Sequence, residues 1–194
     1  MNRLLAMATI VMGAYGCALV SRGEVLSVRY FSPEPIRSTL GSASAQGPRP
    51  AIRLGRVRGA PYLRERIAHR DSEYEVGFYD DRAWTERPEA YVRRALVRKL
   101  FEERGFVRMT GGTAPTLELE VVAFEELRMP PLHAARVEVH YQIRRNETAL
   151  AERTIRIDRP VAGGRFEDVV AAFSGALDEA TGRIADDIAG TVPP

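Results

Sequence analysis

The last part of the chain carries the most regular pattern of hydrophobic and polar positions. Apolar residues recur there at intervals of three and four: Phe166, Val169, Val170, Phe173, Leu177, Ala180, Ile184 and Ile188. This spacing places them on one side of an α-helix, while most of the charged residues fall on the other side. The pattern therefore predicts a long amphipathic helix with one buried face.

A second helical pattern starts at residue 88. Pro88 suits the first helical position, and Glu89 favours the positive end of the helix dipole. The stripe that follows is Val92, Ala95, Leu96, Lys99 and Leu100, in which only the lysine has to extend its charge to solvent. Gly105 is typical of a helix end, so we expect a helix between these limits.

Alternation with a period of two, which is typical of half-buried strands, marks the remaining elements. The predicted strands are residues 25–31, 52–57, 66–70, 74–79, 117–122, 137–144 and 154–158. The short connection at 145–148 predicts that the last two form an antiparallel hairpin. From residue 51 onward the elements predict an α+β fold in the order β-β-β-α-β-β-β-α. We expect an antiparallel or mixed sheet with two helices packed on one face, and the opposite face solvated or used as an interface.

The first 16 residues have the layout of a secretory signal. Arg3 supplies a positive charge, an apolar run covers residues 4–14, and small residues follow at Ala14 and Gly16. The run is too short to cross a bilayer, which needs about 20 residues. We therefore assign residues 1–16 to a signal peptide that is not part of the fold.

Cys17 directly follows this run and is the single cysteine of the chain. The segment Ala14-Tyr15-Gly16-Cys17 resembles a bacterial lipobox, in which the cysteine is diacylated and becomes the new N-terminus. A free, exposed thiol is a liability in an oxidising compartment, which favours lipid attachment at Cys17 over an ordinary signal peptide with an incidental cysteine. Ala18 stands where an aspartate typically retains lipoproteins at the inner membrane, so by resemblance the outer membrane is favoured.

Residues 17–50 are expected to be a lipid-anchored tether with one short strand at 25–31. Residues 32–50 are rich in Pro, Ser, Gly and Ala, a composition that cannot bury enough apolar surface to fold. The α+β domain is then residues 51–194. Its length suits a single hydrophobic core.

Composition and charge exclude several classes of function. Basic residues number 28 and acidic residues 26, a balance that argues against nucleic acid as a partner. One cysteine permits neither an intrachain disulfide nor a cysteine-based zinc cluster, and His69, His133 and His140 lack the spacing of a helical metal pair. We expect no metal and no cofactor.

The polar clusters do not indicate catalysis. Glu118 and Glu120 alternate with apolar residues, so we expect them on the solvated face of a strand and not in acid–base chemistry. The Gly163-Gly164 pair precedes a helix but lacks the Lys, Ser or Thr of a phosphate-binding loop. With no Gly-x-Ser-x-Gly segment either, we assign no catalytic residue and expect no enzyme.

Arg93, Arg94 and Arg98 form a basic region on the first predicted helix. Such a region is usually a solvated helix face. The functional alternative is contact with an acidic partner or with anionic lipid headgroups.

Three segments of the domain resemble a known family. They are Pro61-Tyr62-Leu63 with Ile67 and Arg70, the run from Tyr79 through Trp84 to Pro88, and residues 91–96. Together they resemble the ABC-type transport auxiliary lipoprotein family, whose familiar members are the PqiC-like lipoproteins. In that family a short strand leads to a Pro-Tyr-Leu turn, and a Trp-x-x-x-Pro segment opens the first helix. The resemblance implies structural roles for Pro61, Tyr62, Leu63, Arg70, Trp84 and Pro88.

The resemblance also implies a function. Such proteins are accessory lipoproteins of MCE-type lipid transport, so the expected partners are an MCE-domain protein and the components of an inner-membrane ABC transporter. It implies an outer-membrane anchor on the periplasmic face that acts in docking or assembly, and a homo-oligomer that can be a ring. The alternatives are an envelope assembly lipoprotein, for lipopolysaccharide or a secretion complex, and an exported enzyme.

Overall fold

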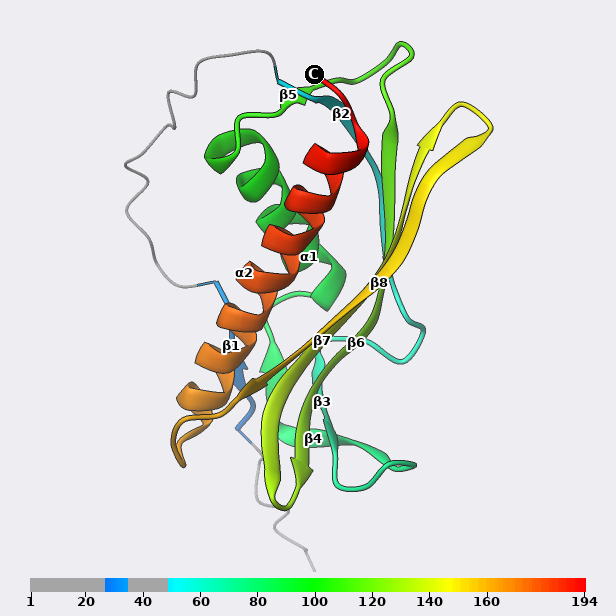
Figure 1. The fold of residues 1–194 in the computed structure, drawn as a ribbon. Coiled ribbons are helices and arrows are strands. Elements are labelled where there is room, and N and C mark those ends of the chain that lie inside the picture. The colour runs from blue at the N-terminus through cyan, green and yellow to red at the C-terminus, as the bar shows by residue number, and fades with distance from the viewer. Residues whose placement is uncertain (1–26, 35–48) are drawn as a thin grey trace, which may run out of the picture.

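The computed structural model describes residues 27–34 and 49–194, so Cys17, the signal segment and most of the predicted tether lie outside the described residues. The elements follow one another along the chain as shown in Figure 1. They are β1 (Arg29–Phe31), β2 (Ala51–Gly59), β3 (Arg66–Arg70), β4 (Val76–Trp84), α1 (Pro88–Val97), the π-helical turn η1 (Arg98–Glu103), β5 (Val107–Arg108), β6 (Thr116–Met129), β7 (Leu132–Arg145), β8 (Thr148–Pro160) and α2 (Phe166–Thr191). The predicted α+β class is confirmed, and the two-residue strand β5 is added to the predicted order of the domain.

The eight strands form one mixed sheet that forks along β6. β6, β7 and β8 pair in antiparallel fashion, as the predicted hairpin requires. The other edge of β6 is shared by two strands that both run parallel to it. β2 pairs with its first half, up to Gly59 opposite Val121, and β3 pairs with its second half, up to Arg70 opposite Leu127. β5 extends the sheet beyond β2, and β4 and β1 extend it beyond β3.

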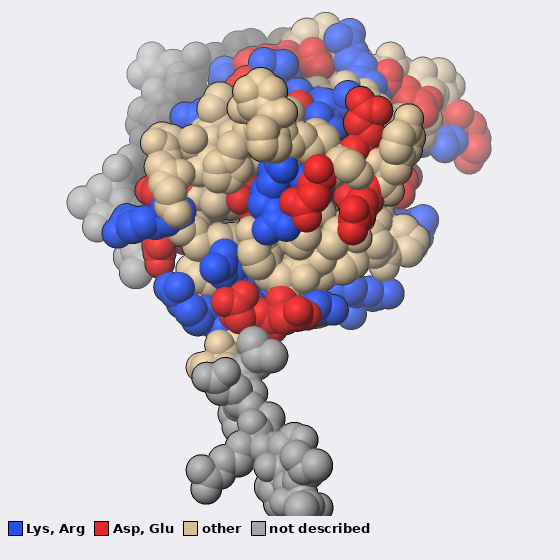
Figure 2. Space-filling view, turned by 90° about the horizontal axis from the view of Figure 1, so that it is seen from below, with Lys and Arg blue, Asp and Glu red and all other residues tan. Residues whose placement is uncertain are grey.

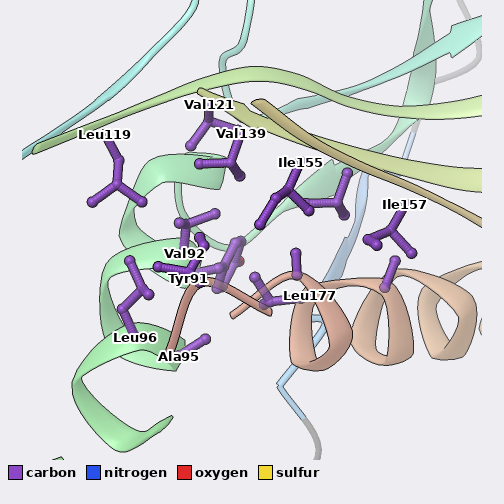
Figure 3. Packing of buried hydrophobic residues seen from close by; sticks show 14 of the residues in the cluster. Tyr91, Val92, Ala95, Leu96, Leu119, Val121, Val139, Ile155, Ile157 and Leu177 are labelled. Atoms are coloured by element: carbon purple, nitrogen blue, oxygen red, sulfur yellow. The ribbon is translucent and has the colours of Figure 1, made fainter. Parts of the chain in front are cut away.

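Both helices cover the same face of this sheet, which confirms the predicted layering (Figure 1). Alternate residues of the strands face them. In Figure 3, Val121, Val139 and Ile155 extend from the strands toward Leu177 of α2 and Val92 of α1. The opposite face is polar and carries cross-strand ion pairs, such as Arg156 with Glu138 and Arg136 with Asp158, each at 2.7 Å.

α2 forms as its apolar spacing predicts. Of the eight residues that define the pattern, all are buried except Val170, which is half-buried. At the N-terminus, the backbone N–H of Arg165 donates to the Asp168 carboxylate at 3.0 Å, the return bond of a capping box. Within the described residues, no helix is long and apolar enough to cross a membrane.

The first helix also ends where it was expected to, but through a π-helical turn. Gly105 has a φ of 67°, which is the left-handed conformation that glycine adopts without strain. The ammonium of Lys99, expected to reach solvent, instead lies between the helices. It forms ion pairs with Glu103 at 2.7 Å and with Asp178 of α2 at 2.8 Å. The lysine in the apolar stripe therefore joins the two helices.

The strand expected at residues 25–31 is present as β1, and it belongs to the sheet. It pairs in parallel with β4, with Phe31 opposite Trp84. The Phe31 ring also lies 4.7 Å from that of Phe166 at the start of α2. The sheet therefore begins well before residue 51, and the segment between Cys17 and the folded domain is shorter than the tether predicted from composition.

Candidate functional site

The Pro61-Tyr62-Leu63 turn lies at the fork of the sheet. It carries the chain from β2 to β3, at the point where β6 changes its parallel partner. The N–H of Ala60 donates to the Val121 carbonyl at 2.9 Å, and the N–H of Leu63 donates back to the Ala60 carbonyl at 2.9 Å, closing the turn. The Leu63 side chain is buried in the core. The turn therefore has a structural role: it joins β2 to β3 and holds Leu63 in the core.

β6 has an irregularity beside this turn. Its register with β7 shifts between Val121 and Ala123, which leaves Val122 as the extra residue of a β-bulge. The Tyr62 hydroxyl lies 3.0 Å from the Val122 carbonyl and 3.3 Å from a carboxylate oxygen of Glu125. A tyrosine from the turn therefore satisfies a carbonyl that the bulge removes from regular strand pairing.

Arg70 and Tyr62 meet at one buried carboxylate. The Arg70 Nε lies 2.5 Å from a Glu125 oxygen, and the Glu125 side chain is 1% exposed. Arg70 also donates to the Glu73 carbonyl at 3.1 Å, which fixes the turn between β3 and β4. Burial, together with the nearby Glu125 charge, raises the pKa of the Tyr62 phenol well above its ordinary value, so the phenol stays a hydrogen-bond donor even at alkaline pH.

We predict that Tyr62→Phe destabilises the domain by about 1–2 kcal/mol, because the Val122 carbonyl loses its partner while the ring is kept. For a chain of this size the midpoint of thermal unfolding should fall by several degrees. Tyr74→Phe is the matched control, since Tyr74 is 93% exposed and the same hydroxyl is removed. Equal melting curves for Tyr62→Phe and the control would contradict the bulge-supporting role.

Trp84 and Pro88 lie at a different place, where β4 passes into α1. Trp84 is buried, with edge-to-face ring contacts to Phe124 at 5.4 Å and Phe173 at 5.1 Å. Pro88 occupies the first turn of α1, where its missing N–H costs no helical hydrogen bond. The N–H of Glu86 donates to the Tyr91 hydroxyl at 3.0 Å. The structure thus divides the six motif residues between the sheet fork and the start of α1.

A second buried carboxylate was not anticipated from the sequence. Glu126 lies on the helix-covered side of β6, where it accepts a hydrogen bond from the Tyr79 hydroxyl at 2.6 Å and lies 2.7 Å from His133 Nε2. Burial, and then the hydrogen bond to Glu126, raises the pKa of Tyr79 to about 12. Arg128 joins this cluster by donating to the Tyr79 hydroxyl at 3.1 Å and forming a 2.7 Å ion pair with Asp71.

One feature of the sequence could have indicated that Glu125 and Glu126 are buried: the apolar run from Val121 to Phe124. Four apolar residues in succession break the alternation of β6, and a bulge is a common cause of such a break. Before the bulge, Glu118 and Glu120 lie exposed on the polar face, as predicted. After it, Glu125 and Glu126 lie buried on opposite faces of the sheet.

The basic region of the first helix is engaged within the chain. Arg94 forms ion pairs with Glu34 at 2.8 Å and Glu86 at 2.5 Å. Arg93 donates to the Gly55 carbonyl at 3.1 Å, and Arg98 lies 3.5 Å from Glu103. Contact of these arginines with a partner or with lipid headgroups stays a prediction.

Among the described residues, no group of three or more His, Cys, Asp or Glu side chains is arranged to hold a metal ion. On the polar face of the sheet there is a hollow lined by charged groups of both signs, which include Arg56, Arg58, Glu118 and Glu120. The buried polar groups described above pair with one another across the strands. Their arrangement joins the turns to the strands of the sheet and so stabilises the fold.

The model of the family described as ABC-type transport auxiliary lipoprotein component matches residues 34–185. The chain belongs to this family. The predicted family resemblance is therefore confirmed over most of the domain. The comparison with curated proteins finds no match.

Solved structures share the fold of this auxiliary lipoprotein. Protein XCC0632 from Xanthomonas campestris is 23% identical, with a TM-score of 0.69 over 84% of this chain and 96% of that one. A second, uncharacterized protein is 15% identical, with a TM-score of 0.66 over 84% and 99%. The hypothetical protein CT253 from Chlamydia trachomatis is 6% identical, with a TM-score of 0.52 over 74% and 98%.

Membership has two direct consequences. A lipoprotein family implies a membrane-anchored location in the cell envelope. The family is one of transport auxiliary components and is not a known enzyme family, which agrees with the structural use of the motif residues described above.

Proposed function

We propose that this protein is an outer-membrane-anchored, periplasm-facing accessory lipoprotein of an MCE/ABC-type transport system for lipids or another hydrophobic solute. The observation that carries the proposal is the family match over residues 34–185. The protein acts in docking or assembly, and its partners are an MCE-domain protein and the inner-membrane ABC transporter components. It performs no chemistry on the transported molecule.

Two features of the domain support a role as a scaffold. The motif residues are used to hold the sheet fork and the start of α1, and the uncovered face of the sheet is lined by charges of both signs. β8 pairs on one edge with β7, and at 13 residues it is long enough to meet a second copy of the chain. A homo-oligomer, closed as a ring, fits this edge.

We expect the tagged protein to co-purify with an MCE-domain protein from detergent-solubilised envelopes. The measurement is quantitative mass spectrometry of the recovered proteins against an untagged strain. A matched control carries Phe173→Asp, which should not fold and should recover nothing specific. Recovery of other envelope proteins without any MCE or ABC component would overturn the proposed partnership.

The anchor has its own test. Mass spectrometry of the mature N-terminus should find acyl chains on Cys17, and density-gradient fractionation should place the protein with the outer membrane. Cys17→Ala should move it to the soluble envelope fraction, since two or three acyl chains are what hold a lipoprotein stably on a bilayer. An unmodified thiol at Cys17 would remove the anchor from the proposal and leave the partnership to be judged separately.

A further inference from the structure

Arginines gather along one edge of the sheet, on β2 and the elements that touch it. We call them the arginine edge: Arg49, Arg53, Arg56, Arg58, Arg93 and Arg108. Three of them belong to β2 itself, and Arg108 lies in β5, opposite Ile52. Arg93 of α1 donates to the Gly55 carbonyl, which holds it against the same strand. β5 and the start of β2 lie at the end of the molecule where α2 ends (Figure 1).

The arginine edge differs in charge from the rest of the surface. None of its six arginines forms an ion pair with a described residue. Most other described arginines are paired, as Arg156 is with Glu138 and Arg136 with Asp158. Figure 2 shows the end of the molecule away from β5, where basic and acidic side chains lie beside one another.

Three carboxylates near the edge offset part of its charge. Glu118 and Glu120 of β6 line a hollow together with Arg56 and Arg58, and none of these four side chains forms an ion pair within the described part of the chain. The Glu89 carboxylate lies beside the end of β2. Because six guanidinium groups outnumber these carboxylates, the edge keeps an excess of positive charge.

Four of the guanidinium groups are held in place by neutral groups of the protein. The contacts are Arg53 with the Thr116 hydroxyl at 2.8 Å, Arg93 with the Gly55 carbonyl at 3.1 Å, Arg49 with the Gly105 carbonyl at 3.2 Å, and Arg108 over the Phe101 ring at 5.5 Å. Such contacts position a cation without neutralising it. An anion that binds here therefore meets cations that are already ordered, which lowers the entropy lost on binding.

The main chain of β2 is also open on this side. β5 pairs with the first two residues of β2, and no other described strand pairs with β2 there. The Ile52 carbonyl accepts from the Met109 N–H at 3.0 Å on that side, so Leu54, two residues later, turns its N–H and C=O the same way. The Ala60 N–H donates to β6 at 2.9 Å, so the N–H of Gly59 points outward. An extended chain can therefore add alongside β2.

We propose that the arginine edge binds an extended acidic segment of a protein partner, whose carboxylates pair with the arginines while its main chain pairs with β2. Arginine binds carboxylates through paired charge-assisted hydrogen bonds. A second copy of the same edge is a poor occupant, because its arginines would face these arginines. A strand edge also favours a polypeptide over a bilayer, since lipid offers no main-chain N–H groups. The inference concerns the chemistry of the partner and does not depend on the transport system to which the protein belongs.

The test measures binding of fluorescein-labelled synthetic peptides by fluorescence anisotropy. The protein is the full-length chain, purified from membranes in nonionic detergent. The probe is a short peptide of Glu and Thr. One comparison peptide has Gln in place of Glu, and another keeps Glu but is N-methylated at alternate backbone positions. We expect the Glu peptide to bind, and both comparison peptides to bind about tenfold more weakly or less, because one lacks the charge and the other lacks the main-chain donors.

Two double variants locate the site. Arg56→Glu with Arg58→Glu should weaken binding of the Glu peptide by about tenfold or more, and should create binding of a Lys/Thr peptide, which also shows that the variant is folded. The matched control is Arg145→Glu with Arg165→Glu. Both of these arginines are exposed and outside any ion pair in the described part of the chain, so net charge changes equally. The control should leave binding nearly unchanged, because salt screens charges that lie beyond about 8 Å.

Several outcomes would overturn the proposal. Equal binding of the Gln peptide would remove the role of charge, and equal binding of the N-methylated peptide would remove the pairing with β2. An equal loss in both double variants would remove the location. Binding to detergent micelles that contain phosphatidylglycerol, without binding of the Glu peptide, would assign the edge to anionic lipid. Since no transport partner is used, these outcomes leave the proposed function to its own test.

Discussion

Replacing Phe173 by Asp should leave the domain unable to fold. Phe173 is 0% exposed, stacks on Phe124 at 4.7 Å and contacts the edge of Trp84 at 5.1 Å. Loss of a buried aromatic ring costs about 3–5 kcal/mol, and an unpaired carboxylate in this apolar site adds several more. Since the whole stability of a domain is about 5–15 kcal/mol, little or none would remain. Circular dichroism and soluble yield measure the outcome.

The control for this substitution is Ala171→Asp, two residues earlier on α2. Ala171 is exposed, so the same charge on the same helix should change the unfolding midpoint little. Phe173→Leu gives a graded case, with an expected loss of about 1–2 kcal/mol because volume is largely kept. A cooperative melt of Phe173→Asp at the temperature of the unsubstituted protein would show that Phe173 does not lie in the core.

α2 and the strands β6, β7 and β8 could be predicted because each depends on residues that lie close together in the sequence. The spacing from Phe166 to Ile188 determines a helix face, and the connection at 145–148 determines a hairpin. The fork of the sheet could not be predicted in this way. Nothing in the period-two pattern of β2 or β3 says that both run parallel to β6, because that pairing joins residues some sixty positions apart, such as Arg53 and Thr116.

The motif residues could be named from the family resemblance, but their contacts could not. Tyr62 could be recognised beside Pro61 in the sequence. Its hydrogen-bond partner, the Val122 carbonyl, could not, because the apolar run indicates an irregular strand without indicating its contacts. The composition of residues 32–50 favoured a free tether. It did not reveal that Glu34 is held by Arg94 or that β1 joins the sheet, since both contacts need the folded domain to exist.

Removing the cation of Arg70 should have the second-largest effect. Arg70→Met keeps the aliphatic stem and leaves the Glu125 carboxylate, which is 1% exposed, without its ion-pair partner. Breaking a buried pair by removing one member costs about 3–5 kcal/mol. The cost should fall toward the lower end of that range, because Arg136 lies opposite Glu125 on β7 and Arg70 is itself 24% exposed. Urea unfolding monitored by Trp84 fluorescence measures the loss.

A rescue variant separates the charge from the packing. Glu125→Gln in the Arg70→Met background removes the uncompensated charge but keeps a group that can accept from the Tyr62 hydroxyl. The double variant should therefore be more stable than Arg70→Met alone, because a neutral amide is far less costly to bury than an unpaired carboxylate. Glu65, which pairs with Arg87 and is 52% exposed, offers the control: Arg87→Met should lower the free energy of unfolding far less than Arg70→Met does, because solvent screens an exposed pair. If Arg70→Met and Arg87→Met lost the same small amount, Glu125 would not need Arg70, and the sheet fork would be held by Tyr62 and the Pro61 turn alone.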